Sequence, residues 1–408
     1  MASQRNRSTA CSLSLSDRNL FSTNSNQIRF TVRAPRRSPH FHSLWLLILV
    51  GSMDSLISSR GKIQSVPESY ILPPETRPSD LVTPLLKTIP VIDLETLGHH
   101  RNELIQHIIK ASQDYGFFQL TNHGVSEELM NDVLTMGAEF FNLPEKDKAR
   151  YYFEKSPFPE VCRLKTSIEY GDEKVHFWRD SFRHPCHPLE DYIQLWPENP
   201  PRYREVVGRF SAEVRRLSLQ LLNLICEGLG LEQGYFEERL SHRQVFSINH
   251  YPPCPDPTSV LGLPKHADPY LITLLNQGHL PGLQVLKDGE WLGVEPLPNA
   301  FVVNINHMLQ VISNGKLKSA DHRVVTNSKA ARTTVVSFIL PSSDCVIEPA
   351  KSLVNEHNPA LYRTFRFGDF LETYGLDTRE GICKFSSHLR EGKTCQFSKY
   401  ATILKLHS

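Results

Sequence analysis

The spacing of apolar residues divides the chain into a helical first part and a β-rich second part. In 101–124, four aliphatic residues recur at helical spacing until Gly116 breaks the pattern, and "FFQLTN" then indicates a strand. Residues 126–152 predict one or two further helices, interrupted near Pro144. Residues 201–230 predict a long amphipathic helix that "GLGL" ends.

The other stretches of the first part are less regular. The prolines of 54–88 predict an extended lead-in, and "IPVIDL" (89–94) predicts a short buried strand. Residues 155–200 contain Pro and His residues without a clear period, so we expect irregular structure there.

After residue 243, short apolar runs alternate with turn signals. These runs are "VFSINHY", "YLITLLNQ", "LQVLKDGEWLGVEPL", "AFVVNINHMLQVIS", "HRVVTN" and "RTTVVSFILP". "KDGEW" predicts an Asp-Gly hairpin, and "SNGK" predicts another turn. Six or more strands at this spacing predict an antiparallel sandwich or barrel, preceded by the helical half.

Composition narrows the function. A chain of 408 residues with 40% hydrophobic content can form one large domain or two associated ones. The net charge of +1 does not indicate nucleic-acid binding. The eight cysteines include no CxxC pair and indicate free thiols in a reducing compartment. GxGxxG, GxxxxGK[ST], HExxH and GxSxG motifs are all absent from the sequence.

The first 52 residues differ from the rest, with seven arginines, no lysine and one acid. The apolar stretch "LWLLILV" is too short to span a bilayer, so we expect no membrane anchor. We interpret this segment as a disordered extension, or as upstream of a true start at Met53, which favours a cytoplasmic location. A transit peptide for an organelle is the alternative.

The stretch "PKHADPYLIT" carries the first candidate chemistry. If it is an extended strand, His266 and Asp268 share one face and can coordinate one metal ion. A structural hydrogen bond between them is the alternative. His322, before the apolar run of "HRVV", is the best third ligand, although it could simply cap a strand. Two His and one carboxylate form the facial triad of non-haem Fe(II) oxygenases, which leaves coordination positions open.

A buried strand that opens with an arginine supplies a second candidate. Arg332 in "ARTTVVSF" is costly to bury unless a carboxylate pairs with it, and Thr334 on the same face can add a hydroxyl donor. Upstream, "INHYPPCPDP" places Asn249 and Tyr251 on one strand face, and the phenol could also hold a carboxylate.

These motifs together resemble the plant 2-oxoglutarate/Fe(II)-dependent dioxygenases. The likeness rests on "IPVIDL", "YGFFQLTNHGV", "INHYPPCPDP", "HADPYLITLL", "SNGKLKSADHRVV" and "ARTTVVSF", and runs from about residue 65 to 375. "FWRDSFRHPCHPLEDYIQLWP" and "IEPAKSLVNEHNPALYRTF" look most like hyoscyamine 6-hydroxylase and the mugineic-acid dioxygenases within that family. The resemblance implies an α+β fold, with a double-stranded β-helix (jelly-roll) core and a helical N-terminal half packed on it.

The resemblance also implies roles for the candidate residues. His266, Asp268 and His322 would bind Fe(II). Arg332, helped by Thr334 and Tyr251, would hold the distal carboxylate of 2-oxoglutarate. The remaining contacts would be Asn249 beside the co-substrate, and Tyr270 and Phe338 lining the pocket of a small-molecule substrate.

The implied reaction couples decarboxylation of 2-oxoglutarate to succinate and CO₂ with hydroxylation of a specialised metabolite. O₂ is the second co-substrate, ascorbate is expected to support activity, and desaturation or epoxidation are further outcomes. A binding protein on the same scaffold and a zinc hydrolase are the competing functions. A monomer is expected, without a nucleic-acid or membrane partner. The implied segments are the extension 1–52, the lead-in 53–88, the N-terminal domain 89–200, the linking helix 201–240, the dioxygenase domain 241–345 and the C-terminal segment 346–408.

The sequence departs from the family pattern at two places. Thr334 stands where the family usually has Ser, and we expect function to survive with a slightly tighter pocket. Asn306-His307 stands where the family usually has Gly-Asp. We expect that turn to lie away from the ligands and to matter little for iron binding.

Overall fold

The structure is a computed structural model that describes residues 56–61, 63–78, 85–86, 89–152, 161–168 and 173–379. The chain divides into two units, 1–51 and 52–408, and every described residue belongs to the second. The expectations for residues 1–52, including the extension, the transit peptide and the start at Met53, lie outside the described residues.

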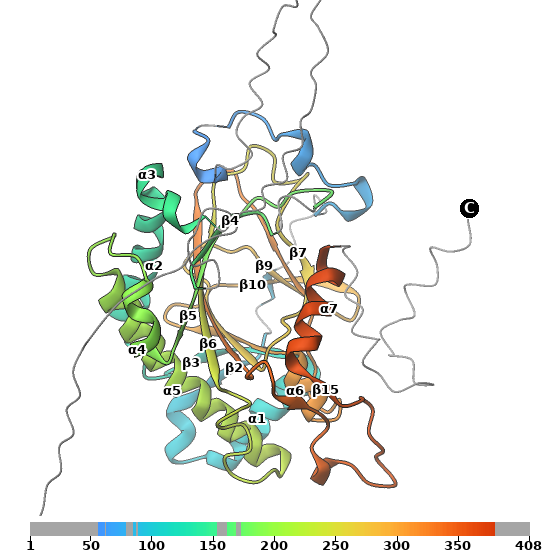
Figure 1. Cartoon of the computed structure of the whole chain (residues 1–408). Helices are drawn as coiled ribbons and strands as arrows, with labels where there is room; N and C mark the ends of the chain where they lie inside the picture. The colour runs from blue at the N-terminus through green and yellow to red at the C-terminus, as the bar shows by residue number, and fades with distance from the viewer. Residues whose placement is uncertain are drawn as a thin grey trace, which may run out of the picture. The chain divides into compact units, whose positions relative to one another are not determined.

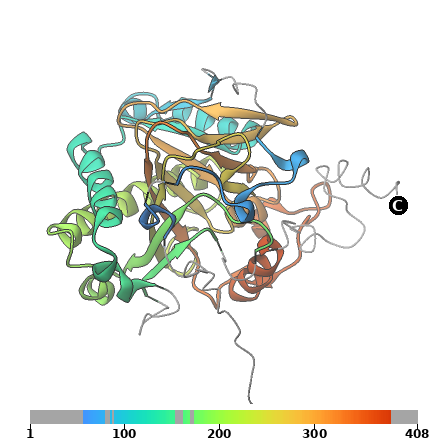
Figure 2. The same cartoon turned by 90° about the horizontal axis from the view of Figure 1, so that it is seen from above.

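Two β-sheets form the centre of the second unit (Figures 1 and 2). The larger sheet has the strand order β2-β3-β11-β8-β13-β6-β5-β4, and the smaller has the order β1-β10-β9-β12-β7. The pairings are antiparallel except for β2 with β3 and β1 with β10. The predicted α+β fold with a jelly-roll core is confirmed. The strands are β1 (Leu85–Leu86), β2 (Val91–Asp93), β3 (Phe117–Thr121), β4 (Arg163–Thr166), β5 (Asp180–His187), β6 (Arg243–Tyr251), β7 (Leu261–His266), β8 (Ile272–Asn276), β9 (Leu283–Lys287), β10 (Glu290–Val294), β11 (Phe301–Ile305), β12 (His322–Val325) and β13 (Arg332–Leu340).

Side chains from both sheets meet in an inner apolar layer. Leu275, Val302 and Val336 of the larger sheet pack in one buried cluster with Leu283 and Val285 of β9. Because successive strand residues point to opposite faces, the alternate residues of the larger sheet point outward. They pack in a second cluster with the helices that cover that sheet. The barrel interior therefore has one wall backed by helices, which holds its inward-facing residues in place.

The helices follow the apolar periodicity. Val206, Phe210 and Val214 belong to the buried stripe of the long helix, and Gly230 ends it in the left-handed conformation with φ 70°. The Ser126 hydroxyl caps the helix that follows it, accepting from Leu129 N. The α-helices are α1 (Arg101–Asp114), α2 (Glu127–Asn142), α3 (Glu145–Lys148), α4 (Leu189–Tyr192), α5 (Tyr203–Leu229), α6 (His307–Ile312) and α7 (Phe367–Arg379).

Short elements complete the unit. The lead-in is not wholly extended, because it contains three single-turn 3₁₀ helices in addition to the strand β1. The 3₁₀ helices of the unit are Ile57–Ser59, Glu68–Tyr70, Pro74–Thr76, Leu94–Gly98, Ala149–Tyr151, Ile193–Leu195 and Lys351–Leu353, and β14 (Val346–Ile347) pairs with β15 (Phe365–Arg366).

The expectation of irregular structure across 155–200 is wrong. Strands β4 and β5 lie in this range, and β5 pairs along β6 in the larger sheet. The burial of β5 alternates strictly from residue to residue. Pro185 and the two histidines of "DSFRHPCH" conceal this alternation from hydropathy, because the buried positions include Asp180 and His184.

Two other strand predictions need correction. The run "AFVVNINHMLQVIS" divides into strand β11 and helix α6, since its apolar spacing changes after Asn306. Strand β2 of "IPVIDL" is at the end of its sheet, and Val91 is 49% exposed rather than buried. The Asp-Gly hairpin is confirmed, because Asp288 and Gly289 both have positive φ and join β9 to β10.

Candidate metal and co-substrate site

Three predicted ligands lie together at one end of the barrel. His266 ends β7 and is the cross-strand partner of His322, which begins β12. Asp268 is not in a strand, so the interpretation of "PKHADPYLIT" as one strand is wrong: β7 ends at His266 and β8 begins at Ile272. The three residues still converge, with one ligand atom from each within 4.8 Å of the others.

Backbone carbonyls fix both imidazole rings. His266 Nδ1 is 2.9 Å from Pro264 O, and His322 Nδ1 is 3.2 Å from Ala320 O. A carbonyl oxygen only accepts, so each Nδ1 carries a hydrogen, and in the neutral ring the lone pair is then on Nε2. These Nε2 atoms lie 3.7 Å and 3.8 Å from Asp268 Oδ1. The lone pairs that a metal requires therefore face one point.

Electrostatics favour the metal-binding protonation states. Burial, together with the neighbouring His322 ring, lowers the pKa of His266 to about 4. Burial opposes ionisation of Asp268, yet His322, His266 and hydrogen bonds from Thr273 and Asn304 outweigh it and lower the pKa of Asp268. Near neutral pH the group presents a neutral His266 and an ionised Asp268, which is the combination that a divalent cation prefers.

The hydrogen bonds to Asp268 leave one oxygen open. Its Oδ2 accepts from Thr273 Oγ1 at 2.8 Å and from Asn304 Nδ2 at 3.3 Å. Asn306 Nδ2 donates to the same Thr273 Oγ1 at 2.8 Å. A hydroxyl has one hydrogen, so Thr273 accepts from Asn306 and must donate to Asp268. Only Oδ1 remains for a metal ion.

The expectation that Asn306-His307 lies away from the ligands is wrong. Asn306 reaches Asp268 through a single hydroxyl, and His307 N donates to Asp268 O at 3.1 Å. The turn folds back because α6 begins there, beside the segment that follows β7. Sequence spacing could not show these contacts, because Asn306 is 33 positions from Thr273 and His307 is 39 positions from Asp268.

Arg332 is buried in the barrel without an acidic partner among the described residues. It is 3% exposed, and its Nε donates to Leu280 O at 2.9 Å. Its Nη2 is buried and has no hydrogen-bond partner in the described part of the chain. The predicted co-substrate residues surround it, because Arg332 is opposite Tyr251 and Thr334 is opposite Asn249 across β13 and β6. An unsatisfied buried guanidinium nitrogen fits a carboxylate ligand.

A second arginine, which the sequence analysis missed, lies next to these residues. Arg179 Nη1 donates to Asn249 Oδ1 at 3.3 Å, and its Nη2 donates to Ser167 O at 3.1 Å. Burial raises the pKa of Tyr251, although Arg179 and Arg332 act against this shift. Tyr251 therefore stays a phenol that can donate a hydrogen bond. The strand alternation of β5 was the signal that could have revealed Arg179, which directly precedes it.

Both predicted substrate-lining residues lie close together. The ring centroids of Tyr270 and Phe338 are 4.9 Å apart. A third residue joins them, because Arg183 Nη2 donates to Tyr270 Oη at 2.6 Å. Arg183 was not predicted, because its segment showed no regular spacing of apolar residues.

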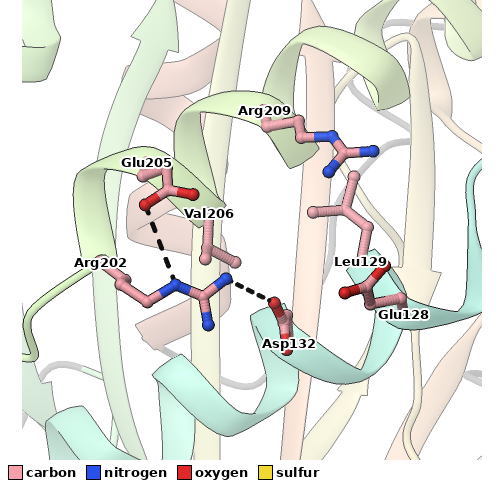
Figure 3. A pocket seen from close by; sticks show the side chains of 7 residues that line it. All are labelled: Glu128, Leu129, Asp132, Arg202, Glu205, Val206 and Arg209. Carbon is pink, nitrogen blue, oxygen red and sulfur yellow. Dashed lines mark hydrogen bonds and ion pairs between the residues drawn. The ribbon is translucent and has the colours of Figure 1, made fainter.

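A recess on the outer helical surface is unrelated to this group. It lies between α2 and α5 and is lined by charged side chains (Figure 3). Arg202 pairs there with Asp132 at 2.9 Å and with Glu205 at 3.8 Å, and Arg209 pairs with Glu213 at 3.2 Å. These arginines are satisfied by neighbouring acids, so the recess shows no free cation for a ligand.

Comparisons with known proteins agree with this geometry. Residues 89–199 match the family model "non-haem dioxygenase in morphine synthesis N-terminal", and residues 242–341 match the "2OG-Fe(II) oxygenase superfamily". Hyoscyamine 6-dioxygenase of Hyoscyamus niger is 44% identical over 329 residues, which cover 78% of this chain and 94% of that protein. The chain belongs to the 2OG-Fe(II) oxygenase superfamily.

Other members of the superfamily show the same extent of likeness. The 2'-deoxymugineic-acid 2'-dioxygenase of Hordeum vulgare is 41% identical over 79% of this chain and 94% of that protein. The crystal structure of JOX2 in complex with 2OG, Fe and JA has a TM-score of 0.71 and 34% identity, over 81% of this chain and 96% of that one. The resemblance read from the motifs is confirmed, and the chain is an Fe(II)/2-oxoglutarate-dependent dioxygenase.

Membership of the superfamily implies Fe(II), 2-oxoglutarate and a small-molecule substrate. The donor set of His266, Asp268 and His322 fits a divalent iron, and the free Arg332 Nη2 fits the co-substrate. None of the described helices is both long enough and apolar enough to span a membrane.

Proposed function

We propose that the chain hydroxylates a small specialised metabolite while it converts 2-oxoglutarate to succinate and CO₂. The observation that carries the proposal is the pairing of two features in one barrel. One is a His-Asp-His group with convergent ligand atoms, in which Asp268 and His322 are buried and His266 is half-buried, and the other is a buried arginine with a free nitrogen. Desaturation and epoxidation are the alternative outcomes of the same site.

His266, Asp268 and His322 are the proposed Fe(II) ligands. When bound there, Fe(II) supplies the activation of O₂ that allows a C–H bond of the substrate to be oxidised. The protein directs Nδ1 of both histidines to backbone carbonyls, so that Nε2 is the ligand atom of each neutral ring, and holds one oxygen of Asp268 toward them. Three protein ligands leave positions open for the co-substrate and O₂.

Arg332, Thr334 and Tyr251 are the proposed donors to the distal carboxylate of 2-oxoglutarate. Arg332 offers Nη2, the Thr334 side chain is 1% exposed, and Tyr251 offers its phenol hydrogen. Asn249 is opposite Thr334, and Arg179 donates to its amide oxygen. We propose that Asn249 lies beside the co-substrate and does not pair with its charged carboxylate. The Thr at 334 keeps the hydroxyl of the usual Ser.

The barrel walls are proposed to exclude water from the reaction. The inner apolar layer of Leu275, Val336 and their neighbours lies between the sheets, on the face that also presents Arg332 and Thr334. In such surroundings charged groups interact more strongly than in water.

Several expectations stay part of this proposal. They are a monomeric enzyme supported by ascorbate, a cytoplasmic rather than organellar location, no nucleic-acid partner, and the division into the segments 89–200, 201–240 and 241–345.

The test is incubation of the protein with Fe(II), ascorbate, O₂ and labelled 2-oxoglutarate in the presence of a broad metabolite panel. We expect labelled succinate that depends on one class of metabolite, and a product that has gained one oxygen atom. An Asp268→Ala variant should lose both signals. If Fe(II) and 2-oxoglutarate bind but no metabolite produces succinate, the chain is a binding protein on this scaffold and the proposal fails.

A further inference from the structure

Arg183 points into the barrel from β5. The buried alternate residues Asp180, Phe182 and His184 point to the other face, where Phe182 packs in the cluster under the helices. Arg183 is opposite Ser247 of β6, on the face that carries Asn249. The cation is therefore held on the inner wall that faces the site.

The surroundings of Arg183 are aromatic rather than acidic. Its guanidinium carbon lies 4.9 Å from the Phe338 ring centroid and 5.4 Å from that of Tyr270. Within the described residues its one hydrogen bond goes to Tyr270 Oη, and no carboxylate pairs with it. The exposed Arg239 differs, because it pairs with Asp344 at 2.6 Å.

This cluster of Arg183, Tyr270 and Phe338 adjoins the proposed metal ligands. Tyr270 follows Asp268 by two residues, and Phe338 is opposite Thr273 across β13 and β8. The Thr273 hydroxyl donates to Asp268. A molecule held by the cluster would therefore lie next to the metal end of the barrel.

When Fe(II) and 2-oxoglutarate are bound, as in the proposed function on which this inference rests, the positive charge of Arg183 has no negative charge to balance it. The two charges of Fe(II) and that of Arg332 are balanced by Asp268 and the two carboxylates of 2-oxoglutarate. Arg179 has Glu173 as a neighbouring acid that stabilises its charge. Arg183 has no such neighbour among the described residues, so a substrate that brings its own negative charge would complete the balance.

We propose that Arg183 binds a carboxylate of the substrate. A planar guanidinium can donate to both oxygens of a carboxylate, while a phosphate group would call for more donors than this cluster offers. Tyr270 Oη accepts from Arg183 and so has its own hydrogen available for the same carboxylate. The faces of Tyr270 and Phe338 then pack on the carbon skeleton beside that carboxylate. The substrate class is a small apolar or aromatic carboxylic acid.

Matched acids and esters test this proposal. The protein is loaded anaerobically with Fe(II) and 2-oxoglutarate, and the visible charge-transfer absorption of the chelate is recorded. Phenylacetic, cinnamic and octanoic acids are then titrated, each beside its methyl ester, because a molecule entering next to the metal perturbs this absorption. We expect the acids to bind at least about tenfold more tightly than their esters, or about 1.4 kcal/mol.

The variant Arg183→Gln should weaken acid binding at least about tenfold and leave ester binding unchanged, with Arg183→Lys in between. The surface variant Arg239→Gln is the matched control and should bind like the wild type. Circular dichroism checks that each variant is folded. Equal binding of acids and esters, an absorption that no acid perturbs, or equal losses of both in Arg183→Gln would overturn the proposal. Absence of the absorption in the wild type would instead refute the iron and 2-oxoglutarate site.

Discussion

The orientation of Asp268 depends on two polar neighbours. The Thr273 hydroxyl can donate to only one acceptor. Because it accepts from Asn306 Nδ2, it donates its single hydrogen to Asp268 Oδ2. Asn306 is fully buried, so water does not compete for this contact. The residue that departs from the usual Gly of the family thus acts on the position of a proposed ligand.

Replacing Asn306 should weaken Fe(II) binding. In Asn306→Ala, the Thr273 hydroxyl loses its fixed direction, and we expect Fe(II) affinity to fall about tenfold. Asn306→Asp should do worse, because an added carboxylate competes with Asp268 for the Thr273 hydrogen. Anaerobic Fe(II) titration measures both, and Thr273→Ser, which keeps the hydroxyl, is the control. Unchanged affinity in Asn306→Asp would show that this contact does not position Asp268.

The residues that the sequence revealed are those with local spacing rules. Arg332 and Thr334 are two positions apart in β13, so the strand rule pairs them correctly. His266 and Asp268 are also two positions apart, but Asp268 lies beyond the end of β7, and the two residues converge without sharing a strand. Arg183 and Asn306 follow no such rule, because their partners Tyr270 and Thr273 come from other strands or turns. Only the fold brings them together.

Helix α5 shows how contacts override helix propensity. Its Gly228 faces α1, where an added Cβ would overlap Ile109 Cγ1, the nearest atom, and would lie 2.8 Å from Ile105 Cγ2. Its Gly208 faces a looser surface, where the nearest atom, Ile193 Cδ1, would lie 3.5 Å away. The same chemical change therefore meets a close packing contact at one position and ordinary van der Waals contact at the other.

Alanine at these two positions should have opposite effects on stability. Gly208→Ala should raise the free energy of unfolding by up to about 1 kcal/mol, since alanine favours the helix. Gly228→Ala gains the same propensity but overpacks α1 against α5, and we expect a net loss of about 1–2 kcal/mol. Urea denaturation of both variants measures the difference. A stabilised Gly228→Ala would mean that α1 can move away without cost.

The elements that could be predicted are those whose burial follows hydropathy. The long stripe of α5 and the Asp-Gly turn between β9 and β10 gave clear signals. Strand β5 gave none, because its buried positions include Asp180 and His184. The backbone amides of Ile57 and Ser58 satisfy Asp180 at 3.0 Å and 2.8 Å, which hydropathy cannot anticipate.

At the level of the molecule, the two halves of the sequence build one sheet. Strands β2 to β5 come from the first half and flank β6, β8, β11 and β13 from the second. Buried histidines lie where this sheet meets the helices. His250 stacks on Phe141 of α2 with the ring centroids 5.0 Å apart, and its Nδ1 contacts Thr333 Oγ1 at 2.9 Å.

Stability should fall in mild acid because these histidines are neutral in the folded state. Burial lowers the pKa of His250 to about 4 and that of His184 to about 3, from the usual 6.5. Between these values and 6.5 the unfolded chain binds more protons, so the free energy of unfolding decreases as the pH falls. For His250 alone the loss between about pH 7 and pH 5 is about 2 kcal/mol.

The variant His250→Gln isolates this contribution. Glutamine can keep a hydrogen bond to Thr333 but does not titrate. Denaturant unfolding at several pH values should therefore show a shallower loss for the variant than for the wild type. Parallel curves for the two proteins would mean that His250 is not kept neutral by folding.

The central claim of the proposed function is that the His-Asp-His group binds Fe(II) while Arg332 binds 2-oxoglutarate. One comparison tests this claim directly. Fe(II) affinity and 2-oxoglutarate affinity are measured anaerobically in the wild type and in Arg332→Ala. We predict that the variant binds 2-oxoglutarate at least about thirtyfold more weakly, or about 2 kcal/mol, while its Fe(II) affinity stays within about twofold. Equal loss of both affinities, or undiminished binding of 2-oxoglutarate, would contradict the account.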